Sequence, residues 1–297
     1  MQASRVAGAP PPPTTGPPML LQRVITAVVL LLVLLPAMVY AGPLPFAAVT
    51  GVLMGAAGWE WSRLNGCGPK EALVSGLGLM GVLGLAWGAW GDAPWPAMVW
   101  WGITALWAVV LVLALRQGVE AWGRWPVALR LPFGWLALAG AWWALVSLHA
   151  RGLGVLLSAL LLVWVADIAA YFGGKAFGRR KLAPRISPGK SWEGVVSGTL
   201  AVLVLAFAWT AVGARGAPAT QALYPILVAR GWVVAIPALL LLTAASVAGD
   251  LFESLVKRSA GVKDSSALLP GHGGVLDRVD ALLPVLPAVM ALLADAA

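Results

Sequence analysis

Long apolar runs alternate with short polar segments along most of the chain. Because about 20 apolar residues suffice for a helix that crosses a bilayer, this pattern predicts an all-α polytopic membrane protein. About nine transmembrane helices are expected, at Leu21–Ala41, Leu44–Trp61, Ala72–Trp90, Pro96–Leu115, Leu131–Leu148, Leu153–Phe172, Trp192–Val212, Trp232–Gly249 and Val279–Leu293.

The composition supports a membrane protein. The chain is 60% hydrophobic and only 11% charged, whereas ordinary globular domains carry about 25% charged residues. The last predicted span is short and contains Pro284 and Pro287, so it is expected to be kinked or irregular.

The distribution of basic residues predicts the orientation. With nine spans, 17 of the 20 lysines and arginines fall on the side of the N-terminus, and only Arg151, Arg215 and Arg230 fall on the other. Cytoplasmic loops are enriched in Lys and Arg. The N-terminus is therefore predicted to be cytoplasmic and the C-terminus external. The net charge of +8 is attributed to topology and anionic lipid, with no nucleic-acid partner.

Three regions are expected. Residues 1–20 form a Pro-rich, disordered tail, residues 21–150 contain the first five spans, and residues 151–297 form the C-terminal transmembrane region, to which any catalytic chemistry is assigned. The last region includes two polar cytoplasmic loops, 173–191 and 250–278, and the chemistry is expected there.

The first polar loop contains six basic residues and no acidic one. It ends in "SPGKSWEG", where Ser187, Lys190 and Ser191 approach the start of the next helix, a position that favours anions. "GKS" invites comparison with a nucleotide-binding P-loop, but Pro184 stands where that motif requires glycine. Phosphate is therefore expected to meet side-chain cations and helix-end amides.

The second polar loop brings acidic residues close to this basic region. Asp250 is expected at a helix C-terminus, where the helix dipole disfavours a carboxylate, so it requires Lys257 or a metal as a partner. Asp277 and Asp280 open the last span, where aspartate is a good N-cap. Carboxylates beside many cations, with one cysteine and two histidines in the chain, favour a hard ion such as Mg²⁺, alone or with a second cation, over zinc.

The stretch "SLVKRSAGVKDSSALLPGHGGVLDRVD" resembles the signature of the phosphatidate cytidylyltransferase family. Every fixed position is filled, by Ser254, Lys257, Arg258, Lys263, Asp264, Pro270, His272, Gly273, Gly274, Asp277, Arg278 and Asp280. "AYFGGKAFGRRKL", "ISPGKSWEG" and "QRVITAVVL" also resemble this family, and Glu60 matches an acidic residue often found in the second span.

The resemblance implies roles for these residues. Asp250 and Asp277 would hold the metal, and they form the catalytic set with Lys257, Arg258 and His272. Substrate contacts are assigned to Ser187, Lys190, Ser191, Ser254, Lys263, Asp264, Gly273, Gly274, Arg278 and Asp280.

The implied reaction joins CTP and phosphatidate to give CDP-diacylglycerol and pyrophosphate. It would take place at the cytoplasmic face of the cell membrane, among membrane lipids, in a monomer or a homodimer. Two other functions are compatible with a charged membrane site. A CDP-alcohol phosphotransferase would carry spaced aspartates after Asp-Gly, which this chain lacks. A lipid transporter would spread its charges through the middle of several spans, whereas here they gather at helix ends.

Overall fold

The computed structural model describes residues 19–39, 42–91, 93–213 and 221–294. The predicted disordered tail lies outside these residues, except for its last two positions. The helices are α1 (Met19–Val39), α2 (Pro43–Leu64), α3 (Pro69–Trp90), α4 (Ala97–Gln117), α5 (Val119–Trp122), α6 (Val127–Ala150), α7 (Leu153–Phe177), α8 (Trp192–Gly213), α9 (Leu223–Ala229), α10 (Trp232–Ser259), α11 (Leu276–Val279) and α12 (Leu282–Ala294). Two strands, β1 (Lys181–Ala183) and β2 (Ser187–Ser191), form an antiparallel hairpin between α7 and α8.

The chain is an all-α polytopic membrane protein with this one hairpin. Seven helices of the described chain are long and apolar enough to cross a membrane, namely α1, α3, α4, α6, α7, α8 and α10. The other two predicted spans correspond to α2 and α12, which are outside this set. With 13 residues, α12 is about 20 Å long, compared with about 30 Å for the hydrocarbon core of a bilayer.

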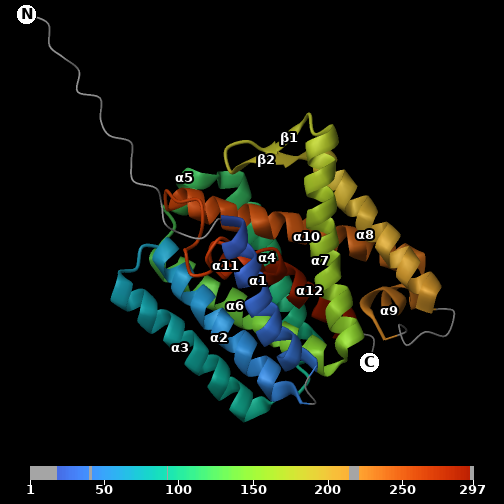
Figure 1. Cartoon of the computed structure of the whole chain (residues 1–297), viewed down its shortest axis with the longest axis horizontal. Helices are drawn as coiled ribbons and strands as arrows, with labels where there is room; N and C mark the ends of the chain where they lie inside the picture. The colour runs from blue at the N-terminus through green and yellow to red at the C-terminus, as the bar shows by residue number, and fades with distance from the viewer. Residues whose placement is uncertain (1–18, 40–41, 92, 214–220, 295–297) are drawn as a thin grey trace, which may run out of the picture.

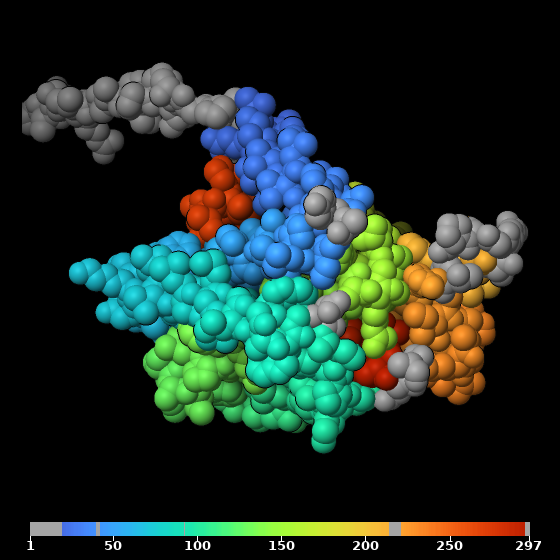
Figure 2. Space-filling model, turned by 90° about the horizontal axis from the view of Figure 1, so that it is seen from below, coloured from blue at the N-terminus to red at the C-terminus, as the bar shows by residue number. Residues whose placement is uncertain are grey.

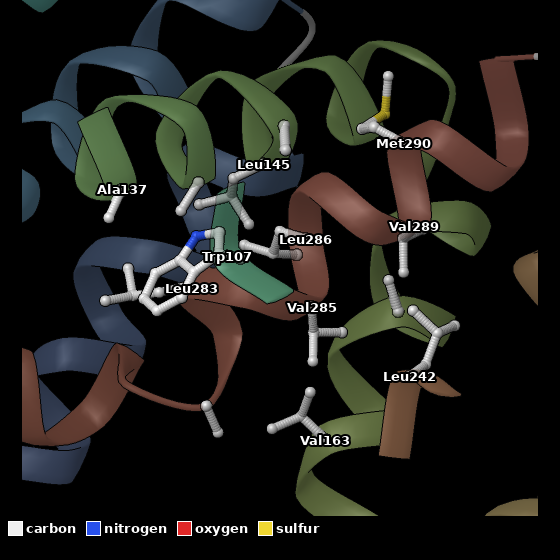
Figure 3. Close-up of a cluster of buried hydrophobic side chains, with 14 of the residues drawn as sticks. Trp107, Ala137, Leu145, Val163, Leu242, Leu283, Val285, Leu286, Val289 and Met290 are labelled. Atoms are coloured by element: carbon white, nitrogen blue, oxygen red, sulfur yellow. The ribbon is translucent and has the colours of Figure 1, made fainter. Parts of the chain in front are cut away.

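The centre of the molecule is built around α12. Leu283, Val285, Leu286, Val289 and Met290 are all buried. Figure 3 shows them facing side chains of α4, α6, α7 and α10. In Figure 1, α12 lies among the longer helices, while α3 and α8 lie on opposite flanks. A short helix that is apolar on all sides is stabilised here by protein on every side, since packing contacts replace those with lipid.

Two arginines complete the C-terminal end of α12. Arg151 donates a hydrogen bond from Nη1 to the carbonyl of Leu293 at 3.1 Å, and Arg230 donates from Nη1 to the carbonyl of Leu292 at 3.0 Å. The last carbonyls of a helix lack intrahelical donors, and cations stabilise that end of the helix dipole. Arg151 and Arg230, two of the three basic residues predicted on the external side, therefore cap α12.

Two helices, α7 and α10, extend well beyond their predicted ends. The seventh helix, α7, continues to Phe177 and α10 continues to Ser259, so the first residues of both polar loops are helical. Hydropathy predicts where apolar residues stop, but Lys, Arg and Glu are good helix formers, and a helix can continue through them. The predicted position of Asp250 at a helix C-terminus is therefore wrong, because nine further residues of α10 follow it.

Removing the α12 caps should weaken the fold. In Arg151→Gln combined with Arg230→Gln, two partly buried, charge-assisted hydrogen bonds to backbone carbonyls are lost. We expect the free energy of unfolding to fall by about 2–4 kcal/mol, measured by thermal unfolding in detergent. Lys70→Gln, at an exposed position on α3, is the control and should leave the melting temperature unchanged. An unchanged melting temperature in the double variant would contradict the capping role.

Candidate functional site

The polar residues of both loops converge on the C-terminal half of α10. Glu253, Ser254 and Lys257 lie three, four and seven residues after Asp250, so the four residues share one stripe of the helix. Figure 1 shows the end of α10 between the hairpin and the segment that leads to α11. The helix therefore carries charges that face two different loops.

The first cluster joins α10 to the hairpin. Lys190 Nζ lies 2.7 Å from Asp250 Oδ2, and both side chains are partly buried. Ser254 Oγ donates to Asp250 Oδ1 over a long 3.4 Å. Asp250 was expected to pair with Lys257 or a metal, and in the structure its cation is Lys190, from the other polar loop.

A cavity of about 550 Å³ opens beside this ion pair. Its wall contains three lysines, from the end of α7, β1 and β2, together with two carboxylates from different helices. Its polar lining residues are Asp167, Tyr171, Lys175, Lys181, Ser187, Lys190, Ser191 and Asp250. The structure thus brings Ser187, Lys190, Ser191 and Asp250, all candidate site residues, to one cavity.

The hairpin is held in place by a carboxylate and close-packed glycines. Glu193 accepts hydrogen bonds from the backbone N–H groups of Arg179 and Arg180 at 3.1–3.2 Å. A Cβ at Gly178 would overlap the carbonyl oxygen of Gly174. These contacts hold the hairpin whose second strand, β2, carries Ser187, Lys190 and Ser191 and directly precedes α8.

The second cluster is centred on Lys257. Its ammonium group lies 2.5 Å from Glu253 Oε2 and 2.6 Å from Asp277 Oδ1. The three side chains are 12%, 3% and 5% exposed. A buried charge is costly unless it is paired, and one ammonium partners two carboxylates here. Glu253 had no assigned role in the sequence, although its spacing from Lys257 could have indicated the pair.

Asp277 also organises the signature loop. Its Oδ2 accepts hydrogen bonds from the backbone N–H of Ser265 (2.9 Å), the hydroxyl of Ser265 (2.9 Å) and the backbone N–H of Gly274 (2.7 Å). Burial opposes ionisation of this carboxyl, but Lys257 and these donors outweigh it and lower the pKa of Asp277 to about 2. Asp277 is consequently an anion at neutral pH.

Glu60, on α2, holds the same loop from the other side. Its side chain is fully buried, and its carboxylate accepts hydrogen bonds from the backbone N–H groups of Val275 (3.0 Å) and Leu276 (2.6 Å). The hydroxyl of Ser266 donates to it at 2.5 Å, and that of Ser265 lies 3.1 Å away. Because Ser265 has one hydroxyl proton, it can donate to Glu60 or Asp277 but not to both at once.

Two glycines make this arrangement sterically possible. Gly273 has a φ of +84°, a conformation that residues with a Cβ rarely adopt. A Cβ at Gly274 would collide with both the Ser265 hydroxyl and the Glu60 carboxylate. The Gly-Gly pair of the signature is therefore required by backbone geometry and by Glu60.

The first helix, α1, also contacts this loop. Arg23 Nε donates to the carbonyl of Gly271 at 3.0 Å, and the Thr26 hydroxyl donates to the carbonyl of Pro270 at 2.9 Å. Figure 2 shows α1 on the surface beside the red-orange segment that contains the signature loop. These contacts hold the backbone on the N-terminal side of His272.

Several predicted site residues lie away from the 550 Å³ cavity. Arg258 donates to the carbonyl of Val262 (3.2 Å), and Arg278 donates to the carbonyl of His272 (2.7 Å). The Nδ1 atom of His272 is buried and has no hydrogen-bond partner among the described residues. Lys263 and Asp264 are exposed.

Asp280 does not have the N-cap role expected for the last span. It is the C-cap residue of α11, and its Oδ1 accepts a hydrogen bond from the next N–H, that of Ala281, at 2.8 Å. The expectation failed because the chain forms the separate short helix α11 before α12 begins.

The proposed metal ligands differ in how well they suit an ion. Asp250 lines the cavity, and its Oδ1 has only the long contact with Ser254. Both oxygens of Asp277 are already engaged. Within the described residues, no three His, Cys, Asp or Glu side chains are grouped as metal ligands. Asp250 therefore fits a hard cation as it stands, whereas Asp277 fits one only if Lys257 leaves its Oδ1.

Fold and site together define a polytopic membrane protein with a pocket in which lysines surround carboxylates, an arrangement suited to phosphate groups and a cation. A model of the cytidylyltransferase family matches residues 21–295, and the chain belongs to this family.

Three relatives illustrate the similarity. The phosphatidate cytidylyltransferase of Pseudomonas aeruginosa is 44% identical over 255 residues, which cover 84% of this chain and 87% of the relative. That of Bacillus subtilis is 34% identical over 269 residues, covering 86% and 91%. That of Haemophilus influenzae is 42% identical over 205 residues, covering 64% of each.

Replacing Glu60 should loosen the signature loop. Glu60→Gln would present an NH₂ group to backbone N–H donors, so at least one buried donor loses its acceptor. We expect amide hydrogen exchange at residues 265–276 to become at least about tenfold faster, which corresponds to the loss of a single buried hydrogen bond.

Exchange is measured by mass spectrometry on the detergent-purified chain. Glu71→Gln on the neighbouring α3, at an exposed position, is the matched control and should exchange like the wild type. Equal protection of residues 265–276 in both variants would show that Glu60 does not hold the loop.

Proposed function

We propose that this chain transfers the cytidylyl group of CTP to phosphatidate, giving CDP-diacylglycerol and pyrophosphate. The observation that carries this proposal is the pairing of Lys190, in a family-like motif of the first loop, with Asp250 at 2.7 Å beside one cavity. Asp250 lies four residues before the family signature on the same helix, and Ser254 of the signature contacts it. The names of the relatives support the choice of substrates.

The lining of the cavity suits the chemistry of phosphoryl transfer. A phosphate oxygen of phosphatidate attacks the α-phosphorus of CTP, a new P–O bond forms, and the bond to the β-phosphate breaks to release pyrophosphate. Several negative charges meet in this step, so catalysis depends on positioning and on cations. Lys175, Lys181 and Lys190 supply positive charge at the cavity. The lipid phosphate is itself the nucleophile, so no covalent protein intermediate is required.

A Mg²⁺ ion, alone or with a second cation, is part of this proposal. When bound it would neutralise phosphate charge, and Asp250 would be its first protein ligand, with Asp277 as the second. Lys257 contacts Glu253 as well as Asp277. It could therefore release Asp277 and remain paired, so an exchange of partners would not strand a buried charge.

The orientation in the membrane is also proposed. We infer nine spans, in which α2 and α12 complete the set of seven long apolar helices, with the N-terminus and the active site on the cytoplasmic side of the cell membrane. The charge bias of the sequence supports this orientation. This orientation places Arg151 and Arg230 on the external side, against the charge bias. Their hydrogen bonds to the C-terminal end of α12 account for these two exceptions.

The activity is tested with purified protein, phosphatidate, Mg²⁺ and CTP labelled at the α-phosphate. The wild type should place the label in a chloroform-soluble lipid. Asp250→Asn should lower this transfer by about a hundredfold or more, the usual loss when one electrostatic group of a transition state is removed. Melting should stay close to that of the wild type, since Asp250 is partly exposed.

Asp250 is a better test position than Asp277, because Asp277→Asn would also break the buried pair with Lys257 and destabilise the fold. Glu71→Gln is the control and should retain full transfer. An absence of label in the lipid product of the wild type would refute the proposed reaction, and wild-type turnover in Asp250→Asn would refute the role of that carboxylate.

A further inference from the structure

A second polar cavity lies on the other side of the hairpin from the proposed active site. It measures about 540 Å³ and is formed by the end of α4, the segment around α5 and the turn of the hairpin. Figure 1 shows the hairpin turn and α5 near each other at the same end of the molecule. Neither cavity shares a lining residue with the other.

Three arginines from three separate segments line this second cavity. They are Arg116 at the end of α4, Arg124 after α5 and Arg185 in the hairpin turn. Within the described part of the chain, none of them forms an ion pair with a carboxylate. Glu120 is the acidic residue of the lining, so the cavity carries an excess of positive charge. The positive-inside rule accounts for the side on which arginines lie, but it does not require them to converge on one cavity.

The walls that carry these arginines are firmly anchored. Trp122 is 2% exposed and donates from Nε1 to Asn65 Oδ1 at 3.2 Å, while Trp125 donates to Gln117 Oε1 at 2.9 Å. Ile186, beside Arg185, is 8% exposed and belongs to the hydrophobic core. The three guanidinium groups therefore extend from backbone segments that are already held in position, which lowers the ordering cost of binding a ligand.

The remaining lining indicates the kind of ligand. Leu115, Val119 and Leu182 add apolar surface to the same cavity, and α4, which ends here, is one of the seven helices able to cross a membrane. A guanidinium group binds phosphate through paired hydrogen bonds. A ligand that offers both phosphate and apolar groups at the end of a membrane helix is an anionic phospholipid.

We propose that this cavity binds the phosphate headgroup of an anionic membrane phospholipid, as a site separate from the one that acts on substrate. The hairpin links the two sites, because Leu182 lines this cavity while the adjacent Lys181 lines the other. A lipid bound here would steady the hairpin that carries Lys181 and Lys190. This last consequence rests on the proposed function, whereas the binding itself does not.

The test uses the full chain in detergent, with phosphatidylglycerol as the probe, phosphatidylcholine as the neutral comparison and native mass spectrometry as the measurement of retained lipid. Arg116→Gln combined with Arg185→Gln should weaken phosphatidylglycerol binding about 25-fold, since each basic residue near a lipid phosphate contributes roughly a fivefold factor. Arg63→Gln combined with Lys70→Gln removes the same charge from the end of α2 and the start of α3 and should leave binding unchanged. All four positions are exposed, so folding should survive, and single Arg124→Gln should show a smaller loss in the same direction.

Four outcomes would overturn the proposal. They are equal loss in the two double variants, equal retention of phosphatidylcholine, displacement of the lipid by inorganic phosphate, and loss of the lipid in Lys181→Gln combined with Lys190→Gln instead. The third would assign the cavity to a soluble anion, and the fourth would place the lipid in the catalytic cavity. Because binding is measured without CTP, these outcomes are independent of whether the chain transfers a cytidylyl group.

Discussion

The arrangement of the site depends on the two ion pairs that Lys257 forms. Its ammonium group partners two buried carboxylates, one on its own helix and one on the signature loop. Without it, the buried carboxyl groups of Glu253 and Asp277 would lose the cation that they share, at a cost of several kcal/mol. The signature loop lies against α10 because this pair is formed, and the remaining hydrogen bonds of Asp277 then determine the path of the loop from Ser265 to Gly274.

The signature loop is also held by parts of the chain distant in sequence. Glu60 on α2 accepts hydrogen bonds from two of its backbone N–H groups, and Arg23 and Thr26 on α1 donate to two of its carbonyls. An irregular segment has few internal hydrogen bonds, so its buried polar groups require partners elsewhere. The first half of the chain therefore contributes to the site by positioning the loop, although the family signature itself lies in the second half.

Hydropathy and family resemblance revealed much of this organisation in the sequence. Every predicted span corresponds to a helix, because an apolar run in a membrane protein has few alternatives to helix formation. The convergence of Lys190 and Asp250 was suggested by the placement of both polar loops on one side. The cation that pairs with Asp250 could not be predicted from the sequence. Spacing along α10 does not decide between Lys257 and Lys190, because the choice depends on where the hairpin lies.

Other features could not be read from local pattern. Glu60 was matched to an acidic residue of the family, but its partners could not be predicted, because its four donor groups belong to residues more than 200 positions away. The hairpin was not anticipated, because "KLAPRISPGKS" contains glycine and prolines that suit a turn as well as an irregular loop. Glu253 shares Lys257 with Asp277, and this arrangement could not be predicted because it depends on the tertiary contact between α10 and the signature loop.

The central claim is that Lys257 and Asp277 stabilise the fold as a pair, and a double-mutant cycle tests it most directly. The free energy of unfolding is measured in detergent for the wild type, Lys257→Met, Asp277→Asn and the double variant. Lys257→Met should destabilise by about 3–5 kcal/mol, because it leaves buried carboxyl groups without their cation. Asp277→Asn should destabilise by less, because Lys257 keeps Glu253 as a partner. The double variant should be less destabilised than the sum of the two by more than about 1 kcal/mol. Additive effects of the two substitutions would contradict the account.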